Sequence, residues 1–246
     1  MSSILSNRVQ KVKPSATMAV TAKANELKAQ GIKVVPMGSG EPDFDTPSNI
    51  QTAAVAAIRG GKTRYTAVDG TAELKSAIRD KFMRDNELEY SANEVMVSCG
   101  GKQVFYNLCQ AILNEGDEVI IPGPYWVSYP DMAILADATP VIIETGLDQD
   151  FKITPEQLES SITKNSKLLV LNSPSNPTGA VYSKEEIEDL GKVLERHPQV
   201  YIISDDIYEH ILLSDDEFVN IAMACPKLKD RIIILNGVSK AYAMTG

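Results

Sequence analysis

The chain has 246 residues, of which 43% are hydrophobic, and a formal net charge of −9 at neutral pH. This length and apolar content allow one large domain, or one domain with an appendage, to bury a substantial core. The acidic balance argues against a nucleic-acid surface, which needs a basic face. It does not argue against a locally basic site that binds an anionic substrate.

Targeting and redox signals are weak throughout the sequence. Cys99, Cys109 and Cys225 show neither zinc-type spacing nor a disulfide framework, so we expect reduced thiols and no metal site. Residues 1–10 lack the apolar core and the cleavage site of a signal peptide. No apolar run approaches the roughly 20 residues that span a bilayer. These features predict a soluble, cytoplasmic protein without a membrane or nucleic-acid partner.

The chain is expected to begin with helices at about Ala16–Ala29, Ser48–Arg59 and Thr71–Asn86, with a Pro- and Gly-rich hinge at Pro36–Pro47. Six strand-like runs follow, and most are separated by helical patterns. The runs are Glu94–Ser98, Glu118–Ile121, Pro140–Glu144, Lys167–Leu171, Val200–Ser204 and Arg231–Leu235.

Helices are predicted between these strands. Apolar residues at helical spacing mark Gln103–Leu113 and Tyr125–Leu135, and capping boxes at Thr154 and Ser183 open two more helices. Strands that are apolar on both faces, such as Leu168–Leu171, are typical of a parallel sheet covered by helices on both sides. The sequence therefore predicts an α/β fold with a site at the carboxyl ends of the strands.

Glycines mark one of these strand ends. Gly100, Gly101 and Lys102 follow the first run and precede a helix, where exposed backbone N–H groups favour an anion. This signal alone is weak, because many α/β turns contain two glycines. The stretch Gly60–Thr63 looks like a Walker A loop, but it follows a predicted helix and lacks the first glycine, so ATP binding is not expected there.

Other strand ends carry polar or aromatic side chains. Trp126, the only tryptophan, follows the second run and is either a stacking platform or an ordinary core aromatic. Two prolines stiffen the loop at 172–179, which holds Asn176. Asp205 ends an apolar strand and, if buried, needs a cationic partner, for which a protonated ring nitrogen is suitable. Tyr208 follows three residues later, and Lys240 follows the last strand.

Together these groups suit a phosphorylated aromatic aldehyde. The glycine turn would take the phosphate, Trp126 would lie on the ring, and Asn176 and Tyr208 would contact the phenolic oxygen. Asp205 would keep the ring nitrogen protonated so that the ring accepts electrons. Lys240 would form an imine with the aldehyde and carry a proton once displaced.

Three motifs, in this order and rough spacing, resemble the class I aminotransferases of fold type I, which use pyridoxal 5′-phosphate (PLP). They are NSPSNPTG at 172–179, SDDIYEH at 204–210 and SK at 239–240. Three more stretches are similar to the bacterial aspartate aminotransferase branch: VKPSAT at 12–17, GEPDFDTP at 40–47 and PYWVSYP at 124–130. The similarity covers essentially the whole chain.

The resemblance implies transamination of an acidic amino acid, with aspartate and 2-oxoglutarate giving oxaloacetate and glutamate through a Schiff base on Lys240. It also implies that the phosphate is contacted from Gly101, Lys102 and Ser239. Substrate contacts are implied for the residues Gly40, Lys102, Trp126, Asn176 and, on weaker grounds, Lys13, for which a solvated lysine is an equal alternative.

The resemblance further implies a homodimer, because Tyr65 matches a tyrosine that reaches the phosphate of the neighbouring subunit. It divides the chain into residues 1–46, which belong to or border a small domain, and residues 47–246, an incomplete PLP-binding large domain. The family continues past Thr245 and Gly246 with Trp-Arg, whose arginine binds the phosphate, and with a C-terminal domain that binds the substrate α-carboxylate.

Four hypotheses for the function of the chain follow from these expectations. An aspartate-type aminotransferase leads, and a prephenate- or aromatic-preferring aminotransferase or a β-lyase of the same fold is the alternative enzyme. A non-catalytic ligand sensor and an inactive fragment are the other readings. Asp206 stands where the family usually has glutamate, which we interpret as a neutral variation beside Asp205.

Overall fold

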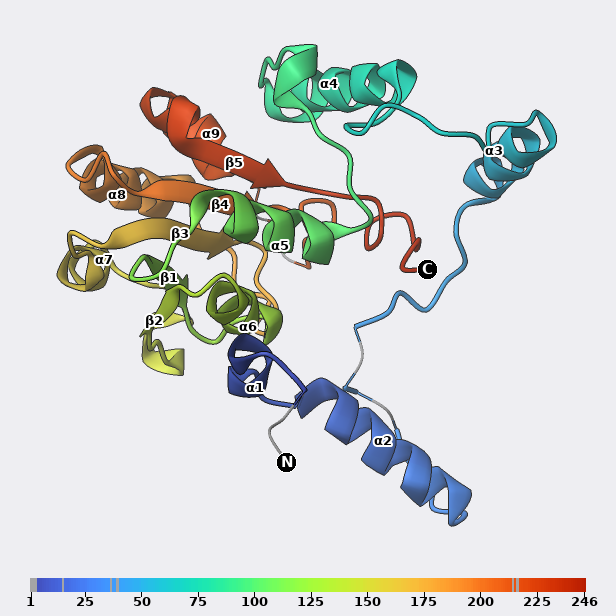
Figure 1. The fold of residues 1–246 in the computed structure, drawn as a ribbon, viewed down its shortest axis with the longest axis horizontal. Coiled ribbons are helices and arrows are strands. Elements are labelled where there is room, and N and C mark those ends of the chain that lie inside the picture. The colour runs from blue at the N-terminus through green and yellow to red at the C-terminus, as the bar shows by residue number, and fades with distance from the viewer. Residues whose placement is uncertain (1–3, 15, 36, 39, 214, 216) are drawn as a thin grey trace.

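A computed structural model of the chain describes residues 4–14, 16–35, 37–38, 40–213, 215 and 217–246. Ser15 of the VKPSAT motif, and Pro36 and Ser39 of the predicted hinge, lie outside these residues. Five strands form one sheet in the order β2-β1-β3-β4-β5, and every neighbouring pair is parallel (Figure 1). The strands are β1 (Glu118–Pro122), β2 (Thr139–Ile143), β3 (Ser166–Asn172), β4 (Tyr201–Asp205) and β5 (Ile232–Leu235).

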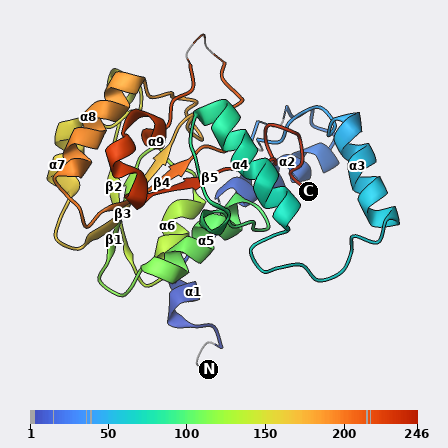
Figure 2. The same ribbon diagram turned by 90° about the horizontal axis from the view of Figure 1, so that it is seen from above.

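Both faces of the sheet are buried. Successive side chains of a strand point to opposite sides, so neighbouring residues of one strand belong to different apolar clusters. Leu169 of β3 and Ile202 of β4 belong to one apolar cluster, whereas Val170 and Ile203 belong to the other. The predicted parallel sheet with two covered faces is therefore confirmed (Figure 2).

Helices on the two sides complete these clusters. One side is covered by α4 (Ala72–Asn86), α7 (Pro155–Ser161), α8 (Lys184–Glu195), α9 (Ile221–Ala224) and the 3₁₀ helix η3 (Pro226–Arg231). The other side is covered by α5 (Gly101–Ile112) and α6 (Ser128–Leu135).

The helix starts follow local capping chemistry. Thr154 and Ser183 each form a complete capping box, at the starts of α7 and α8 respectively, as the sequence predicts. Helix α6 begins at Ser128, three residues later than the predicted Tyr125, because the turn that follows β1 extends through Val127. A short 3₁₀ helix, η2 (Leu147–Gln149), lies between β2 and α7.

The prediction of a strand at Glu94–Ser98 is wrong. Its first residue ends the 3₁₀ helix η1 (Ala92–Glu94), and residues 95–98 pair with no described strand. The amide of Val97 instead donates to the carbonyl of Asp69 at 3.0 Å. Alternating apolar residues suit an extended segment, but a strand also requires a neighbour to accept its hydrogen bonds.

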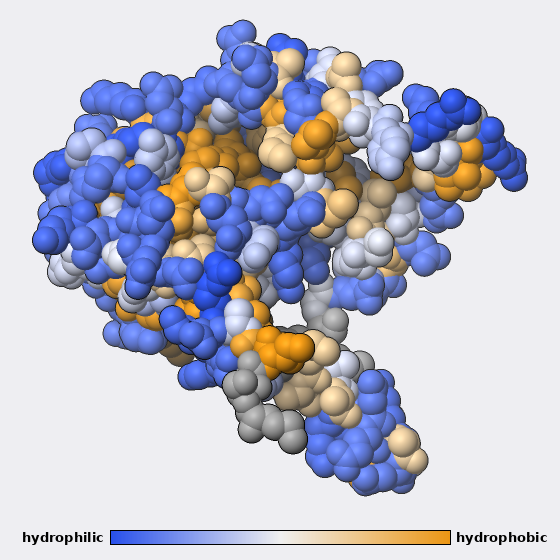
Figure 3. Space-filling model, viewed as in Figure 1, coloured by the Kyte–Doolittle hydropathy of each residue, from blue (hydrophilic) through white to orange (hydrophobic). Residues whose placement is uncertain are grey.

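Three helices precede the packed part of the chain: α1 (Asn7–Lys11), α2 (Ala16–Ala29) and α3 (Ser48–Arg59), the last two with the predicted bounds. Among the described residues, the first buried apolar side chain is Phe82 of α4. Helix α3 buries no residue, and it projects away from the sheet (Figure 1). Its Val55 and Ile58 are exposed, and apolar surface gathers there (Figure 3).

The C-terminal segment runs from β5 to the loop at 40–46. Thr46 Oγ1 donates to the carbonyl of Ala243 at 2.6 Å, and Thr245 Oγ1 donates to Glu41 Oε1 at 2.6 Å. Two segments that lie about 200 residues apart in sequence thus meet beyond the carboxyl end of the sheet.

Candidate active site

Polar side chains meet where β3 and β4 end. Asn172 and Asp205 are register partners in the last position of the two strands. Asn172 Nδ2 donates to the backbone carbonyl of Asp205 at 2.9 Å, and its Oδ1 accepts from the amide of Asn176 at 2.8 Å. Asn172 therefore joins the stiff loop at 172–179 to the end of β4.

Asp205 is buried, with 4% of its surface exposed. Its Oδ2 accepts from the Tyr129 hydroxyl at 2.5 Å and its Oδ1 accepts from the Ile207 amide at 3.2 Å. No cation pairs with it among the described residues. Burial raises the pKa of Asp205 to about 6, and the two hydrogen bonds oppose that rise.

Tyr129 is a residue of this site that the sequence reasoning missed. It lies in the first turn of α6, is 2% exposed, and its hydroxyl is aimed at Asp205. Its ring packs against Phe105 at 5.0 Å and edge-on against Trp126 at 5.2 Å between centroids. A tyrosine among apolar residues just after a strand end was the available signal, because a buried phenol usually has a hydrogen-bond partner.

Trp126 and Lys102 lie together at the starts of α6 and α5. The Lys102 Nζ atom is 5.2 Å from the centroid of the Trp126 ring, within the range of a cation–π contact. Lys102 is exposed and Trp126 is half-buried. The indole is therefore partly packed against the apolar cluster of α5 and α6, with Lys102 Nζ near its ring.

At the glycine turn before α5, the amides of Gly101 and Lys102 have no hydrogen-bond partner among the described residues, whereas the amide of Gln103 donates to the carbonyl of Gly100 at 3.0 Å. Gly100 is the N-cap residue at φ +87°, and no side chain caps the helix. A Cβ atom on Gly101 would lie 3.1 Å from Cδ2 of Leu235 in β5, so the glycine lets the helix start approach the sheet. Unpaired amides at a helix N-terminus are donors that favour an anion.

Lys240 follows β5 and is half-buried. Its Nζ donates to the backbone carbonyl of Gly40 at 2.8 Å, so two predicted site residues are in direct contact. Ser239, which precedes it, accepts from the amide of Met244 through its carbonyl at 3.0 Å. The amine thus has a neutral backbone partner and no carboxylate partner among the described residues.

Tyr208 and Asn176 are also brought together. The Asn176 side chain lies close enough to the Tyr208 hydroxyl to lower the pKa of Tyr208. Burial and the nearby charge of Asp205 raise the pKa of Tyr208, and the Asn176 side chain opposes this rise. The two side chains that were assigned to the phenolic oxygen of the ligand therefore lie next to each other.

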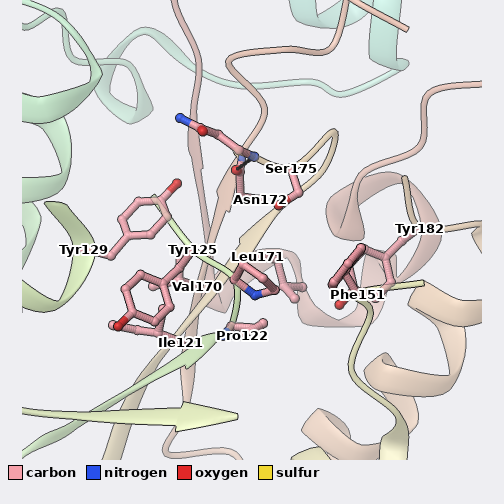
Figure 4. Close-up of a pocket in the computed structure, with 12 residues that line it drawn as sticks. Ile121, Pro122, Tyr125, Tyr129, Phe151, Val170, Leu171, Asn172, Ser175 and Tyr182 are labelled. Carbon is pink, nitrogen blue, oxygen red and sulfur yellow. Dashed lines mark hydrogen bonds between the residues drawn. The ribbon is translucent and has the colours of Figure 1, made fainter. Parts of the chain in front are cut away.

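A pocket lies beside these groups at the ends of β1 and β3. Figure 4 shows Tyr125 and Tyr129 on one side, Asn172 and Ser175 above, and Tyr182 on the opposite side. Lys13 and Tyr65 are not part of this cluster, and both are exposed. The described residues contain no group of three or more His, Cys, Asp or Glu side chains that could hold a metal ion.

The residues present fit PLP. A buried carboxylate without a cation suits a protonated ring nitrogen, and an uncapped helix start suits a phosphate. A lysine held only by a backbone carbonyl suits an aldehyde. The fold and these strand-end groups define an α/β protein with a candidate ligand site at the carboxyl edge of a parallel sheet.

Comparison with known proteins gives the family. Residues 32–246 match the family described as aminotransferase class I and II, so the chain belongs to that family. It is 60% identical over 242 residues to an aspartate/prephenate aminotransferase of Nitrosomonas europaea, covering 98% of this chain and 61% of that protein. It is 52% identical to an aspartate aminotransferase of Bacillus sp. strain YM-2, with 100% and 62% covered.

Solved structures agree with the fold. An aspartate aminotransferase from Rhizobium meliloti is similar with a TM-score of 0.96 and 47% identity, covering 98% of this chain and 60% of that one. An aspartate aminotransferase from Thermus thermophilus, solved with maleate, gives 0.92 and 48%, covering 98% and 62%. The chain thus spans about three-fifths of the length of these relatives. Across its described residues, no helix is both long and apolar enough to cross a bilayer.

Proposed function

We propose that this chain forms the PLP-binding part of an aminotransferase that acts on an acidic amino acid. The observation that carries the proposal is Asp205, a buried strand-end carboxylate without a cationic partner among the described residues. The family membership and the relatives' names support it.

When bound, PLP supplies an aldehyde that condenses with amines and a ring that accepts electron density. Asp205 holds the proton of the ring nitrogen, and Tyr208 and Asn176 orient the phenolic oxygen. Trp126 covers one face of the ring and excludes water from it. Lys240 Nζ is the nucleophile and, in its neutral form, the base that moves a proton at the substrate carbon.

The groups that we assign to the phosphate and to the substrate lie at the edge of the candidate site. The amides of Gly101 and Lys102, with Ser239, bind the phosphate. Lys102 Nζ also attracts the distal carboxylate of aspartate or 2-oxoglutarate, and Gly40 lines the same space because it contacts Lys240. Lys13 is the least supported substrate residue, since it is exposed.

Prephenate is the second candidate amino acceptor. Its support is that two relatives named aspartate/prephenate aminotransferase, from Nitrosomonas europaea and Cereibacter sphaeroides, are 60% and 57% identical to this chain. A β-lyase of the same fold has no comparable observation in its favour.

We further propose that the protein acts as a homodimer. Helix α3 presents an apolar surface, and Tyr65 is fully exposed and so accessible to a partner subunit. The division into residues 1–46 and 47–246 and the cytoplasmic location stay predictions of the sequence.

The test is an absorption spectrum of the purified chain with added PLP, followed by borohydride reduction and peptide mapping. The proposal expects a visible band and a reduced adduct on Lys240, and it expects Lys240→Ala to lose both. Label scattered over exposed lysines such as Lys13, with the same spectrum in wild type and Lys240→Ala, would contradict it.

A further inference from the structure

A polar cluster around a buried carboxylate lies behind the candidate site, and the proposed reaction does not use it. Its centre is Glu209, which is 5% exposed and directly follows Tyr208. The other members come from α4 and from the segments after β4 and β5. We call this set the Glu209 cluster, and its members are Lys81, Asp85, Asn86, Glu209, His210 and Asn236.

Four side chains approach the Glu209 carboxylate. Lys81 Nζ forms an ion pair with Oε1, and Asn236 Nδ2 donates to the same oxygen at 2.9 Å. Asn86 Nδ2 approaches Oε2 at 3.3 Å, and His210 Nε2 is 3.2 Å from Oε1. A carboxylate this buried is stable only when its oxygens are paired, so the segments that supply its partners are held in one arrangement.

The partners belong to segments that carry the site. Asn236 immediately follows β5 and precedes Lys240 by four residues, and its Oδ1 accepts from the Gly237 amide at 2.7 Å. The Glu209 amide donates to the carbonyl of Asp206 at 3.0 Å, which closes the turn that contains Tyr208. One carboxylate therefore joins the Tyr208 turn to the Lys240 segment.

Helix α4 supplies the fixed support for this junction. Its Asn86 is 2% exposed and accepts from Lys81 Nζ at 2.8 Å, so the two side chains are themselves tied together. Phe82 of the same helix lies in the apolar cluster on that side of the sheet. The helix is thus packed by apolar contacts and presents its polar groups to Glu209.

We propose that Glu209 is a positioning residue that fixes the Tyr208 turn and the Lys240 segment relative to each other, and so sets how well the site receives PLP. This inference rests on the proposed function for its consequence, but the coupling of the two segments is a property of the chain alone. Glu209 touches neither cofactor nor substrate in this proposal.

The decisive variant is Glu209→Gln. Glutamine has the same size but turns one acceptor into a donor, and Lys81, Asn86 and Asn236 all donate to this position. We expect amide exchange to rise at least about tenfold in peptides covering 205–212 and 236–246, because unpaired buried groups favour local opening.

Glu118→Gln is the matched control. Glu118 accepts from Thr163 Oγ1 at 2.6 Å and Ser166 Oγ at 3.0 Å at the opposite end of the sheet. The control should leave exchange in both site peptides unchanged even if it lowers overall stability. Equal exchange in the site peptides of Glu209→Gln and wild type would overturn the proposal.

Asn236→Ala keeps the test decisive if Glu209→Gln does not fold. It removes the bond from Asn236 to Glu209 and the local bond from the Gly237 amide to Asn236, so exchange should rise in 236–246 and remain unchanged in 205–212. The affinity for PLP should fall about tenfold in Asn236→Ala and not in Glu118→Gln. A rise confined to other regions of the chain would count against the proposal.

The two proposals fail separately. If wild type forms no adduct on Lys240, the proposed function is wrong, and the exchange data still decide whether Glu209 couples the segments. If the adduct forms and neither cluster variant changes exchange or affinity, the positioning role is wrong and the proposed function stands.

Discussion

The Tyr129 hydroxyl donates to Asp205 Oδ2 at 2.5 Å, across the boundary between α6 and the end of β4. Both side chains are buried, so this contact is shielded from solvent. It gives the carboxylate one of its two described hydrogen bonds, and the other comes from the backbone of Ile207. The pKa of Asp205 therefore depends on Tyr129, which lies 76 positions earlier in the chain.

Tyr129→Phe should destabilise the fold in a pH-dependent way. The pKa of Asp205 is about 6 with the hydroxyl present and should rise further without it, since the bond from Tyr129 lowers the pKa. At pH 8 the carboxylate is charged and loses a partner, which costs about 1–3 kcal/mol. At pH 4.5 it is protonated and the cost should be smaller.

Urea unfolding at the two pH values measures this difference. Tyr106→Phe is the control, because Tyr106 lies on α5 and is exposed. A loss of stability for Tyr129→Phe that is the same at both pH values would show that the hydroxyl does not act through the charge of Asp205.

Asp206→Asn should flatten the pH dependence of stability. Burial raises the pKa of Asp206 to about 8, although Ser204 and Asn220 donate to its two oxygens. Between the unfolded pKa, about 4, and pH 8 the folded chain holds one proton that the unfolded chain releases. The contribution of this group to the unfolding free energy is therefore complete below pH about 4, and it is lost progressively as the pH rises from about 4 through 8.

The variant removes that proton, so the fall in unfolding free energy between pH 6 and 8 should be reduced by about 1.4 kcal/mol per unit. Unfolding curves at half-unit steps measure the slope, with the exposed Asp230→Asn as control. Parallel slopes for wild type and Asp206→Asn would rule out a protonated Asp206.

Gly191→Ala should disturb the packing of α8 against α9 and so lower the unfolding free energy. A Cβ atom there would lie 2.3 Å from the Cys225 sulfur and 3.3 Å from its Cβ. Overpacking of this kind costs about 1–3 kcal/mol, which outweighs the gain of about 1 kcal/mol from replacing glycine inside a helix. In a Cys225→Ala background the sulfur is gone, and the same substitution should become close to neutral.

Chemical unfolding of wild type, the two single variants and the double variant gives the coupling between the two positions. The same loss from Gly191→Ala in both backgrounds would mean that the sulfur is not the obstacle.

Cys99 should be the only thiol that reacts quickly in the folded chain. It is exposed, whereas burial raises the pKa of Cys109 to about 12 and that of Cys225 to about 11. Thiolate is the reactive form, so a disulfide reagent at pH 8 should modify one thiol natively and all three in urea. PLP should slow the native reaction, because Cys99 adjoins the Gly100 turn.

Peptide mapping identifies the modified residue, and Cys99→Ser should abolish the rapid phase. Native labelling of Cys109 or Cys225 at a comparable rate would contradict the burial of that thiol in its apolar cluster. A PLP effect that persists unchanged in Lys240→Ala would place the ligand elsewhere.

Local signals in the sequence were sufficient for most of the fold. The capping boxes at Thr154 and Ser183 are contacts between residues three positions apart, so they are readable without a structure. Apolar residues on both faces of β3 and β4 predicted the parallel sheet and, with it, the edge where the site lies.

Contacts between distant residues were decided only by the tertiary structure. The segment 94–98 has the apolar pattern of a strand, but pairing depends on a neighbour that the pattern does not reveal. Tyr129 meets Asp205, and Lys240 meets Gly40, across 76 and 200 residues, and no local rule links such positions. The sequence alone therefore determined the elements and the chemical groups, because these depend on short-range geometry. The structure decided which groups share a proton or a partner, because that depends on how the elements pack.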